Sequence, residues 1–135
     1  MNFFSILVKC FALVSFLLSQ DIDSSSLLDI GNEIQQLEKQ YTKLPDLFKS
    51  KVLPVYEERL DNRLSIKPSS FESRIKINNP SYHWCMAKLY LLSNDTMKLR
   101  AHYARYLSLI DTDNDVPLLF KQPIPVTELM SSSLL

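Results

Sequence analysis

Residues 82–92, YHWCMAKLYLL, decide the fold of this chain. Apolar side chains occupy nearly every position, so a helix built from this stretch presents an apolar surface on almost every side. Such a helix is stable in water only when other elements pack around it. Asn79 followed by Pro80 is typical of a helix N-terminus, because asparagine caps free N–H groups and proline fits the first turn. The sequence therefore predicts a central, buried helix that begins near Pro80.

A second helix is predicted directly after this one. Asp95 follows an interruption by polar residues and can cap the new helix. The inward face is predicted from apolar residues three or four apart: Leu99, Tyr103, Leu107 and Ile110. Other sides of the helix are predicted to carry Lys98, Arg100, His102 and Arg105. The two helices form a predicted αα-hairpin at the centre of the core.

An amphipathic helix is predicted near the beginning of the chain. Six apolar residues alternate spacings of three and four, which is the period of a helix with one apolar seam: Leu27, Ile30, Ile34, Leu37, Tyr41 and Leu44. Pro45 forces the residue before it out of the α region and ends this helix. The seam suits a bundle helix packed inside the protein. It also suits a short coiled-coil contact, so these six residues are a candidate interaction surface.

The middle of the chain is less regular. Asp46 can cap a further helical piece, and Pro54 either kinks it or opens a new helix at its first turn. Leu53, Tyr56, Leu60 and Leu64 continue an apolar face. Within residues 65–79, the alternation of charged and apolar side chains at residues 74–77 favours a short edge strand.

The C-terminal part reads as an extended apolar tail over residues 116–135, with prolines at positions 117, 123 and 125. It either lies across the bundle, covering apolar surface, or docks into the groove of a partner. Its candidate contact residues are Leu118, Leu119 and Phe120.

These patterns predict an all-α protein: a small bundle of four to five helices, kinked near Pro54, with a central αα-hairpin and an extended, proline-containing C-terminal tail. The chain has 135 residues, which suits a single domain, and it contains one glycine, far fewer than sheets and tight turns normally use. Residues 21–115 are the predicted helical domain. Residues 1–20 are a signal peptide or a buried N-terminal helix.

Residues 1–20 have three interpretations. The run CFALVSFLLS has the length of a signal-peptide core, and polar residues follow it. A narrow polar stripe instead favours a mostly buried amphipathic helix. The third interpretation is a mis-annotated start, with the true chain beginning near Asp21. No stable transmembrane anchor is expected, because residues 3–18 fall short of a spanning helix and contain Lys9. Localisation stays open: the secretory pathway or the extracellular space if residues 1–19 are removed, otherwise inside the cell.

Charge and composition exclude several function classes. Lysine plus arginine equals aspartate plus glutamate at 15 each, so no net field attracts nucleic acid, and nucleic-acid binding is not expected. A single glycine cannot build a phosphate-cradling loop. Asp111, Asp113 and Asp115 match the first ligand positions of a calcium loop, but Val116 and Gln122 stand where glycine and a bidentate carboxylate are needed.

Catalytic residues, cofactors and metal ligands are not predicted. His83 and Cys85 are two apart on a predicted helix, so they point to different sides and cannot chelate one ion. A nucleophile pair would require His102 to reach Cys85 across the hairpin turn. We interpret Cys85 as a small buried hydrophobe and His102 as a surface residue.

These observations favour a non-enzymatic helical protein that acts through protein–protein interaction, as a subunit or adaptor in a larger assembly. A protein partner is expected; its identity is not encoded in any recognisable motif. The alternative is a secreted small helical ligand or carrier, released after signal-peptide cleavage. Asn94 begins the triplet Asn-Asp-Thr, an N-glycosylation acceptor that agrees with this alternative.

The N-terminus distinguishes these alternatives. If the full chain, expressed in a eukaryotic cell with a C-terminal tag, is secreted, the product in the medium begins near Gln20 and its intact mass includes any glycan on Asn94. If residues 1–20 are part of the fold, Met1 or its processed neighbour is retained and the medium is empty. Intact mass and N-terminal sequencing of both fractions measure this.

Overall fold

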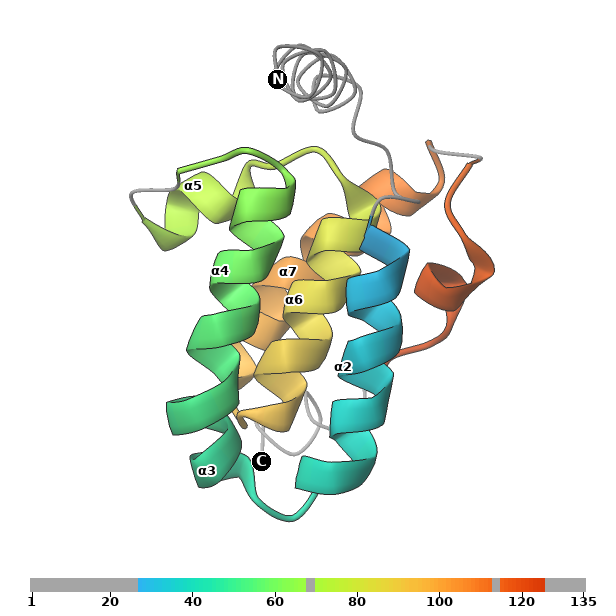
Figure 1. Ribbon diagram of the computed structural model, residues 1–135. Coiled ribbons are helices and arrows are strands. Elements are labelled where there is room, and N and C mark those ends of the chain that lie inside the picture. Colours follow the sequence, from blue (N-terminus) through green and yellow to red (C-terminus); the bar gives the residue numbers. More distant parts are fainter. Residues whose placement is uncertain (1–26, 68–69, 113–114, 126–135) are drawn as a thin grey trace, which may run out of the picture.

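The computed structural model describes residues 27–67, 70–112 and 115–125. Within these ranges the chain is helical and contains no strand, which confirms the predicted all-α bundle. In Figure 1, α2, α6 and α4 lie side by side, and α7 packs behind α6. The elements are α2 (Leu28–Tyr41), α3 (Pro45–Leu47), the π-helical segment η2 (Phe48–Val52), α4 (Leu53–Arg63), α5 (Phe71–Ile75), α6 (Pro80–Leu92), α7 (Thr96–Ile110) and the 3-10 turn η3 (Leu118–Lys121).

Helix α6 is the centre of the core, as its sequence predicts. Every residue of this helix except Leu91 is buried. The Asn79 side chain accepts a hydrogen bond from the Tyr82 N–H at 3.2 Å, and Pro80 fills the first turn. The helix is therefore fixed at its start by local sequence and along its length by neighbours on all sides.

The turn between α6 and α7 closes the predicted hairpin. Asn94 takes a left-handed conformation, with φ of 63°, which asparagine tolerates better than most residues. The Asp95 N–H reaches back to the Tyr90 carbonyl at 2.9 Å, and the Asp95 side chain accepts from the Lys98 N–H at 3.2 Å. One turn thus caps the end of α6 and the start of α7 without any glycine.

The inward face of α7 differs from the prediction. Leu99, His102 and Tyr106 are its buried residues, whereas Leu107 is 50% exposed. The expectation that His102 lies on the surface is therefore wrong, because this side chain is fully buried. Polar and aromatic groups of α6 receive the imidazole, so the helix turns that side inward and leaves Leu107 outside.

Helix α2 places its seam against the core. Leu27, Ile30 and Ile34 are completely buried, and Leu37 and Tyr41 pack partly buried against the same cluster. The helix ends at Tyr41. Leu44, the residue before Pro45, leaves the α region, as proline requires, and is 48% exposed.

The segment around Pro54 is a continuous helical arm with a π-helical turn. The Leu53 N–H bonds the Phe48 carbonyl, five residues back, immediately before Pro54. A proline inside a helix cannot donate to the carbonyl four residues earlier and crowds it, so the wider turn accommodates the ring. Asp46 lies within the first turn of α3, and no side chain caps that helix.

Residues 71–75 form the short helix α5, so the predicted edge strand is wrong. The Ser70 side chain accepts from the Ser73 N–H at 3.2 Å and starts the helix. Arg74 then points into the bundle, where it meets carboxylates of α4. Local alternation misled the prediction because Arg74 is held by tertiary contacts that the pattern does not contain.

The described part of the predicted tail, residues 116–125, lies across the bundle; we call it the strap. Val116, Phe120 and Ile124 are buried, and the Tyr106 hydroxyl donates to the Phe120 carbonyl at 2.5 Å. Residues 126–135 and the interpretations of residues 1–20 lie outside the described residues. Among the described residues, no helix has the length and apolar character to cross a bilayer.

Asn79 tests the capping of α6. We expect Asn79→Ala to lower the free energy of unfolding by about 1 kcal/mol, because a buried N–H loses its acceptor. Asn79→Ser retains an acceptor oxygen and should stay close to wild type. Urea denaturation followed by helical circular dichroism measures both, and an equal loss in the two variants would contradict the capping role.

Candidate functional site

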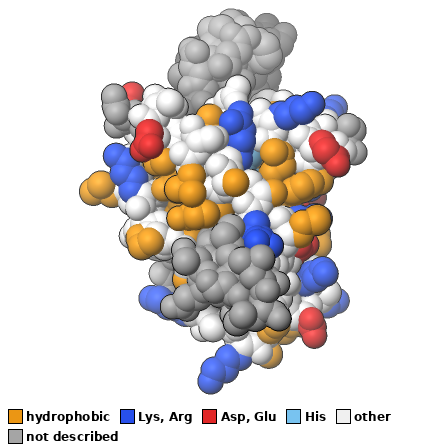
Figure 2. Space-filling view, turned by 180° about the vertical axis from the view of Figure 1, so that it is seen from behind, with side chains coloured by type: hydrophobic (Ala, Val, Ile, Leu, Met, Phe, Trp, Pro, Cys, Tyr) orange, Lys and Arg blue, Asp and Glu red, His pale blue; other side chains and the backbone are white. Residues whose placement is uncertain are grey.

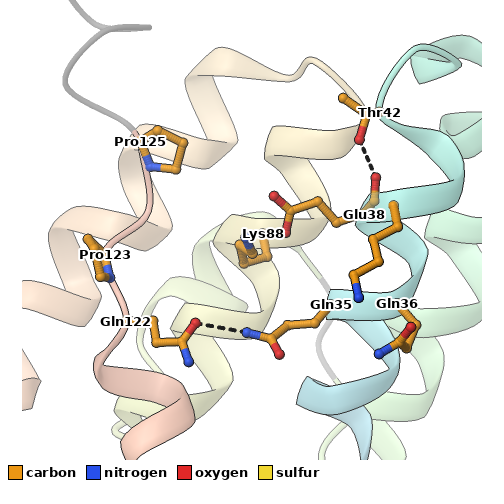
Figure 3. A pocket seen from close by; sticks show the side chains of 9 residues that line it. Gln35, Gln36, Glu38, Thr42, Lys88, Gln122, Pro123 and Pro125 are labelled. Carbon is orange, nitrogen blue, oxygen red and sulfur yellow. Dashed lines mark hydrogen bonds and ion pairs between the residues drawn. The ribbon is translucent and has the colours of Figure 1, made fainter.

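A polar groove lies between α2 and the strap and encloses about 580 Å³ (Figure 3). Gln35 donates to the Gln122 side chain at 2.9 Å and bridges the two walls. Pro123 and Pro125 form the strap side, facing the polar side chains of α2. The remaining lining residues are Gln36, Glu38, Lys39, Thr42 and Lys88. Amide, hydroxyl and charged groups of this kind can pair with the backbone of an extended peptide or with another polar ligand.

Lys88 anchors the base of this groove. Its side chain is 8% exposed, and its Nζ donates to the Glu38 carboxylate at 2.6 Å. The same ammonium lies 5.7 Å from the centre of the Trp84 ring. The Thr42 hydroxyl bonds the Glu38 carbonyl, next to this ion pair. The groove therefore contains a cation that is fixed in place by an acid and an indole.

A second polar cluster joins α4, α5 and α6. Arg74 donates to Asp61 at 2.8 Å and to Glu57 at 3.3 Å. Two tyrosine hydroxyls of α6 donate to the same acids, Tyr82 to Asp61 at 3.0 Å and Tyr90 to Glu57 at 2.6 Å. A shallow cavity of about 300 Å³ borders this cluster on the α4 side. Each of the two carboxylates therefore accepts hydrogen bonds from Arg74 and from one tyrosine hydroxyl. Buried carboxylates are stable only when they are hydrogen-bonded in this way.

His83 and His102 form a buried pair whose tautomers are fixed by geometry. His83 Nε2 lies 2.6 Å from the Ile77 carbonyl, which only accepts, so this nitrogen carries the proton. The two Nδ1 atoms lie 2.9 Å apart. In a neutral pair His102 Nδ1 must therefore donate to His83 Nδ1. His102 Nε2 is then a bare acceptor, and it has no hydrogen-bond partner among the described residues.

Burial controls the protonation of this pair. Desolvation lowers the pKa of His83 to about 4 and that of His102 to about 3. Arg105 also disfavours charge on His83, and His83, Arg74 and Lys98 disfavour charge on His102. Both imidazoles are neutral at pH 7. Burial also raises the pKa of Cys85, so its thiol remains protonated and unreactive in the core.

The outer side of α7 carries a third feature. Met97, Arg100, Ala104 and Leu107 recur at helical spacing along this side; we call them the α7 stripe. Met97 is 65% and Leu107 50% exposed. On this face of the molecule, hydrophobic side chains gather with lysines and arginines among them (Figure 2).

The predicted site residues divide between core and surface. Leu27, Ile30, Ile34 and Phe120 are buried in the core, and Leu37, Tyr41 and Leu119 are partly buried against it. Only Leu44 and Leu118 are largely exposed, at 48% and 80%. The predicted seam is therefore used mainly for packing within the chain.

Other sequence-based candidates are not brought together. Cys85 is buried, as expected, and His102 contacts His83 instead of this thiol. In the described ranges no three His, Cys, Asp or Glu side chains converge as a metal site requires, and part of the calcium-like loop lies outside those ranges. Asn94 is exposed in the hairpin turn, and its glycosylation stays a prediction.

Sequence reasoning missed the groove, the histidine pair and the α7 stripe. The stripe has a signal in the sequence, since Met97, Ala104 and Leu107 share one helical face. The groove and the histidine pair join residues distant in the chain and have no local signal. No protein-family model, curated protein or solved structure matches this chain.

The histidine pair predicts acid sensitivity. In the folded state both histidines have pKa values below the unfolded value of about 6.5. As pH falls from about 6.5 towards 4, the unfolded state therefore binds protons that the folded state does not bind, and the free energy of unfolding decreases. His102→Phe should flatten this dependence, since only His83 still titrates. Urea midpoints between pH 7 and 5 measure it. Carboxylates such as Asp29, whose pKa is lowered by hydrogen bonds from Arg63, change the free energy of unfolding mainly at lower pH. Equal slopes in wild type and variant would contradict the assignment.

Proposed function

We propose that this protein is non-enzymatic and acts by binding another protein through the α7 stripe, as a subunit or adaptor in a larger assembly. The observation that carries the proposal is the exposure of Met97 and Leu107 on a helix whose other side is packed in the core. Two large apolar side chains at helical spacing, with the small Ala104 between them, suit the close approach of a partner helix.

The charge of α7 indicates which partner fits. The helix contains Lys98, Arg100 and Arg105 and no acidic residue. Arg105 is held by the oxygens of Ile75, Asn78 and Ser108. A helix with an apolar stripe flanked by aspartate or glutamate would complement this surface, with the charges contributing mainly to association rate and specificity.

The alternative, a secreted ligand or carrier, is supported by one observation. Asn94 is exposed in a turn, where an oligosaccharyltransferase and a glycan have room. A role as a carrier of apolar ligands has less support. The groove is lined by amides, charged side chains and prolines, whereas sites for apolar ligands are lined mostly by apolar side chains.

Leu107→Glu tests the proposed interaction. The change places a carboxylate in the apolar stripe at an exposed position, so the free energy of unfolding should change by less than about 0.5 kcal/mol. Affinity for a partner that binds the stripe should fall by about 10-fold or more, which corresponds to 1.4 kcal/mol. Val55→Glu is the matched control, because Val55 is similarly exposed, at 52%, on α4.

The measurement has two stages. Proteins captured by the wild-type chain are compared with those captured by the two variants, and each candidate is then purified and titrated by calorimetry. A partner lost with Leu107→Glu, retained with Val55→Glu and weakened by salt supports the proposal. Partners that bind the Leu107→Glu variant as tightly as wild type would exclude the α7 stripe.

A further inference from the structure

We propose that the surface under the strap, formed by α2, α6 and Tyr106 of α7, is a binding site for a proline-containing peptide, which the strap occupies in this structure and a partner segment of the same chemistry enters in its place. This site uses residues other than the α7 stripe. It is therefore independent of the function proposed above, and either proposal can fail alone.

The first element of recognition is a notch for an aromatic ring. Phe120 is fully buried and packs edge to face on Trp84, with ring centres 5.3 Å apart. A Cβ at Gly31 would lie 2.7 Å from Phe120 Cε1 and 2.9 Å from Leu119 Cδ2. Because Gly31, the only glycine of the chain, has no side chain, the Phe120 ring can pack directly against the backbone of α2. A glycine inside a helix is unfavourable by roughly 0.5 to 1 kcal/mol, which the buried ring offsets.

The second element is recognition of main-chain carbonyls. Trp84 Nε1 donates to the Gln122 carbonyl at 3.1 Å, and the Tyr106 hydroxyl donates to the Phe120 carbonyl. Gln122 has φ of −71° and ψ of 139°, the polyproline II region, and two prolines follow at positions 123 and 125. Aromatic donors aimed at the carbonyls of such a segment are a general means of binding proline-containing peptides.

The strap is attached in a way that permits exchange. Among the described residues, its main-chain N–H groups that bond other main-chain atoms do so within the strap itself, as Phe120 to Pro117 and Gln122 to Leu119. The groove of about 580 Å³ beside Pro123 and Pro125 is left open.

The occupied site defines the chemistry of the partner segment. Val116, Phe120 and Ile124 are the buried side chains, four residues apart, and Leu118 between them is exposed. The segment that fits therefore carries a phenylalanine in a short 3-10 turn, three residues before the first proline of an extended Pro-x-Pro sequence, and an aliphatic residue between the prolines. The strap competes at an effective concentration of about millimolar, as a tethered ligand does.

The experiment uses the full chain and its single tryptophan. Phe120→Ala should release the strap and move the emission of Trp84, which is 1% exposed in the wild type, to longer wavelength. A synthetic peptide with the sequence of residues 116–125 should then bind saturably and reverse this shift. The same peptide carrying Phe120→Ala should bind about 100-fold more weakly or worse, since truncating a buried phenylalanine removes at least about 3 kcal/mol.

Gly31→Ala is the discriminating control. The added methyl group closes the notch, so the strap is released but the peptide cannot replace it, while helix α2 itself gains propensity. Leu118→Ala removes an exposed strap side chain and should resemble wild type without peptide. If Phe120→Ala loses its helical circular dichroism, Phe120→Leu replaces it, because leucine retains an apolar side chain at the notch.

Three results would overturn the proposal. A folded Phe120 variant with exposed Trp84 that fails to bind the peptide shows that the surface is ordinary core. Equal binding by the Gly31→Ala variant shows that the notch does not select the ring. If the wild-type chain restores the emission and elutes with the Phe120 variant as a dimer, the occupant is a second copy of this chain and not a separate partner.

Discussion

The burial of α6 on all sides is the constraint on which the rest of the structure depends. A helix that reads YHWCMAKLYLL has almost no face that water solvates well, so neighbours must cover its whole circumference. Helices α2, α4 and α7 supply most of that cover, and the strap covers the part that includes Trp84. A segment of ten residues with little regular structure thus completes the core, because three helices around a fourth leave a gap.

The same constraint explains the polar interior. Tyr82, His83, Lys88 and Tyr90 lie on α6, and their polar atoms are buried with it. Each finds a partner on another element: tyrosine hydroxyls meet acids of α4, Lys88 meets an acid of α2, and His83 meets His102 of α7. A buried polar atom without a partner is costly, so these bonds select one arrangement of the helices around α6.

The two binding surfaces that we propose differ in shape and chemistry. The α7 stripe combines the exposed apolar side chains of Met97 and Leu107 with Arg100 on a basic helix, and we propose that a helical partner binds it. The surface under the strap combines a ring-sized notch at Gly31 with donors for main-chain carbonyls and suits an extended segment. In the adaptor role that we propose, the two surfaces would bind different kinds of partner.

The sequence by itself determined the helices whose signals are local. Asn79 with Pro80 and Asp95 mark helix starts that the structure confirms, because a cap and its first turn lie within a few residues. Only the tertiary structure decided which side of α7 turned inward and where Arg74 and the strap went. His102 is inside because rings and His83 on other elements receive it. The spacing of apolar residues shows which residues share one face of a helix. Which face is buried depends on residues that are distant in the chain.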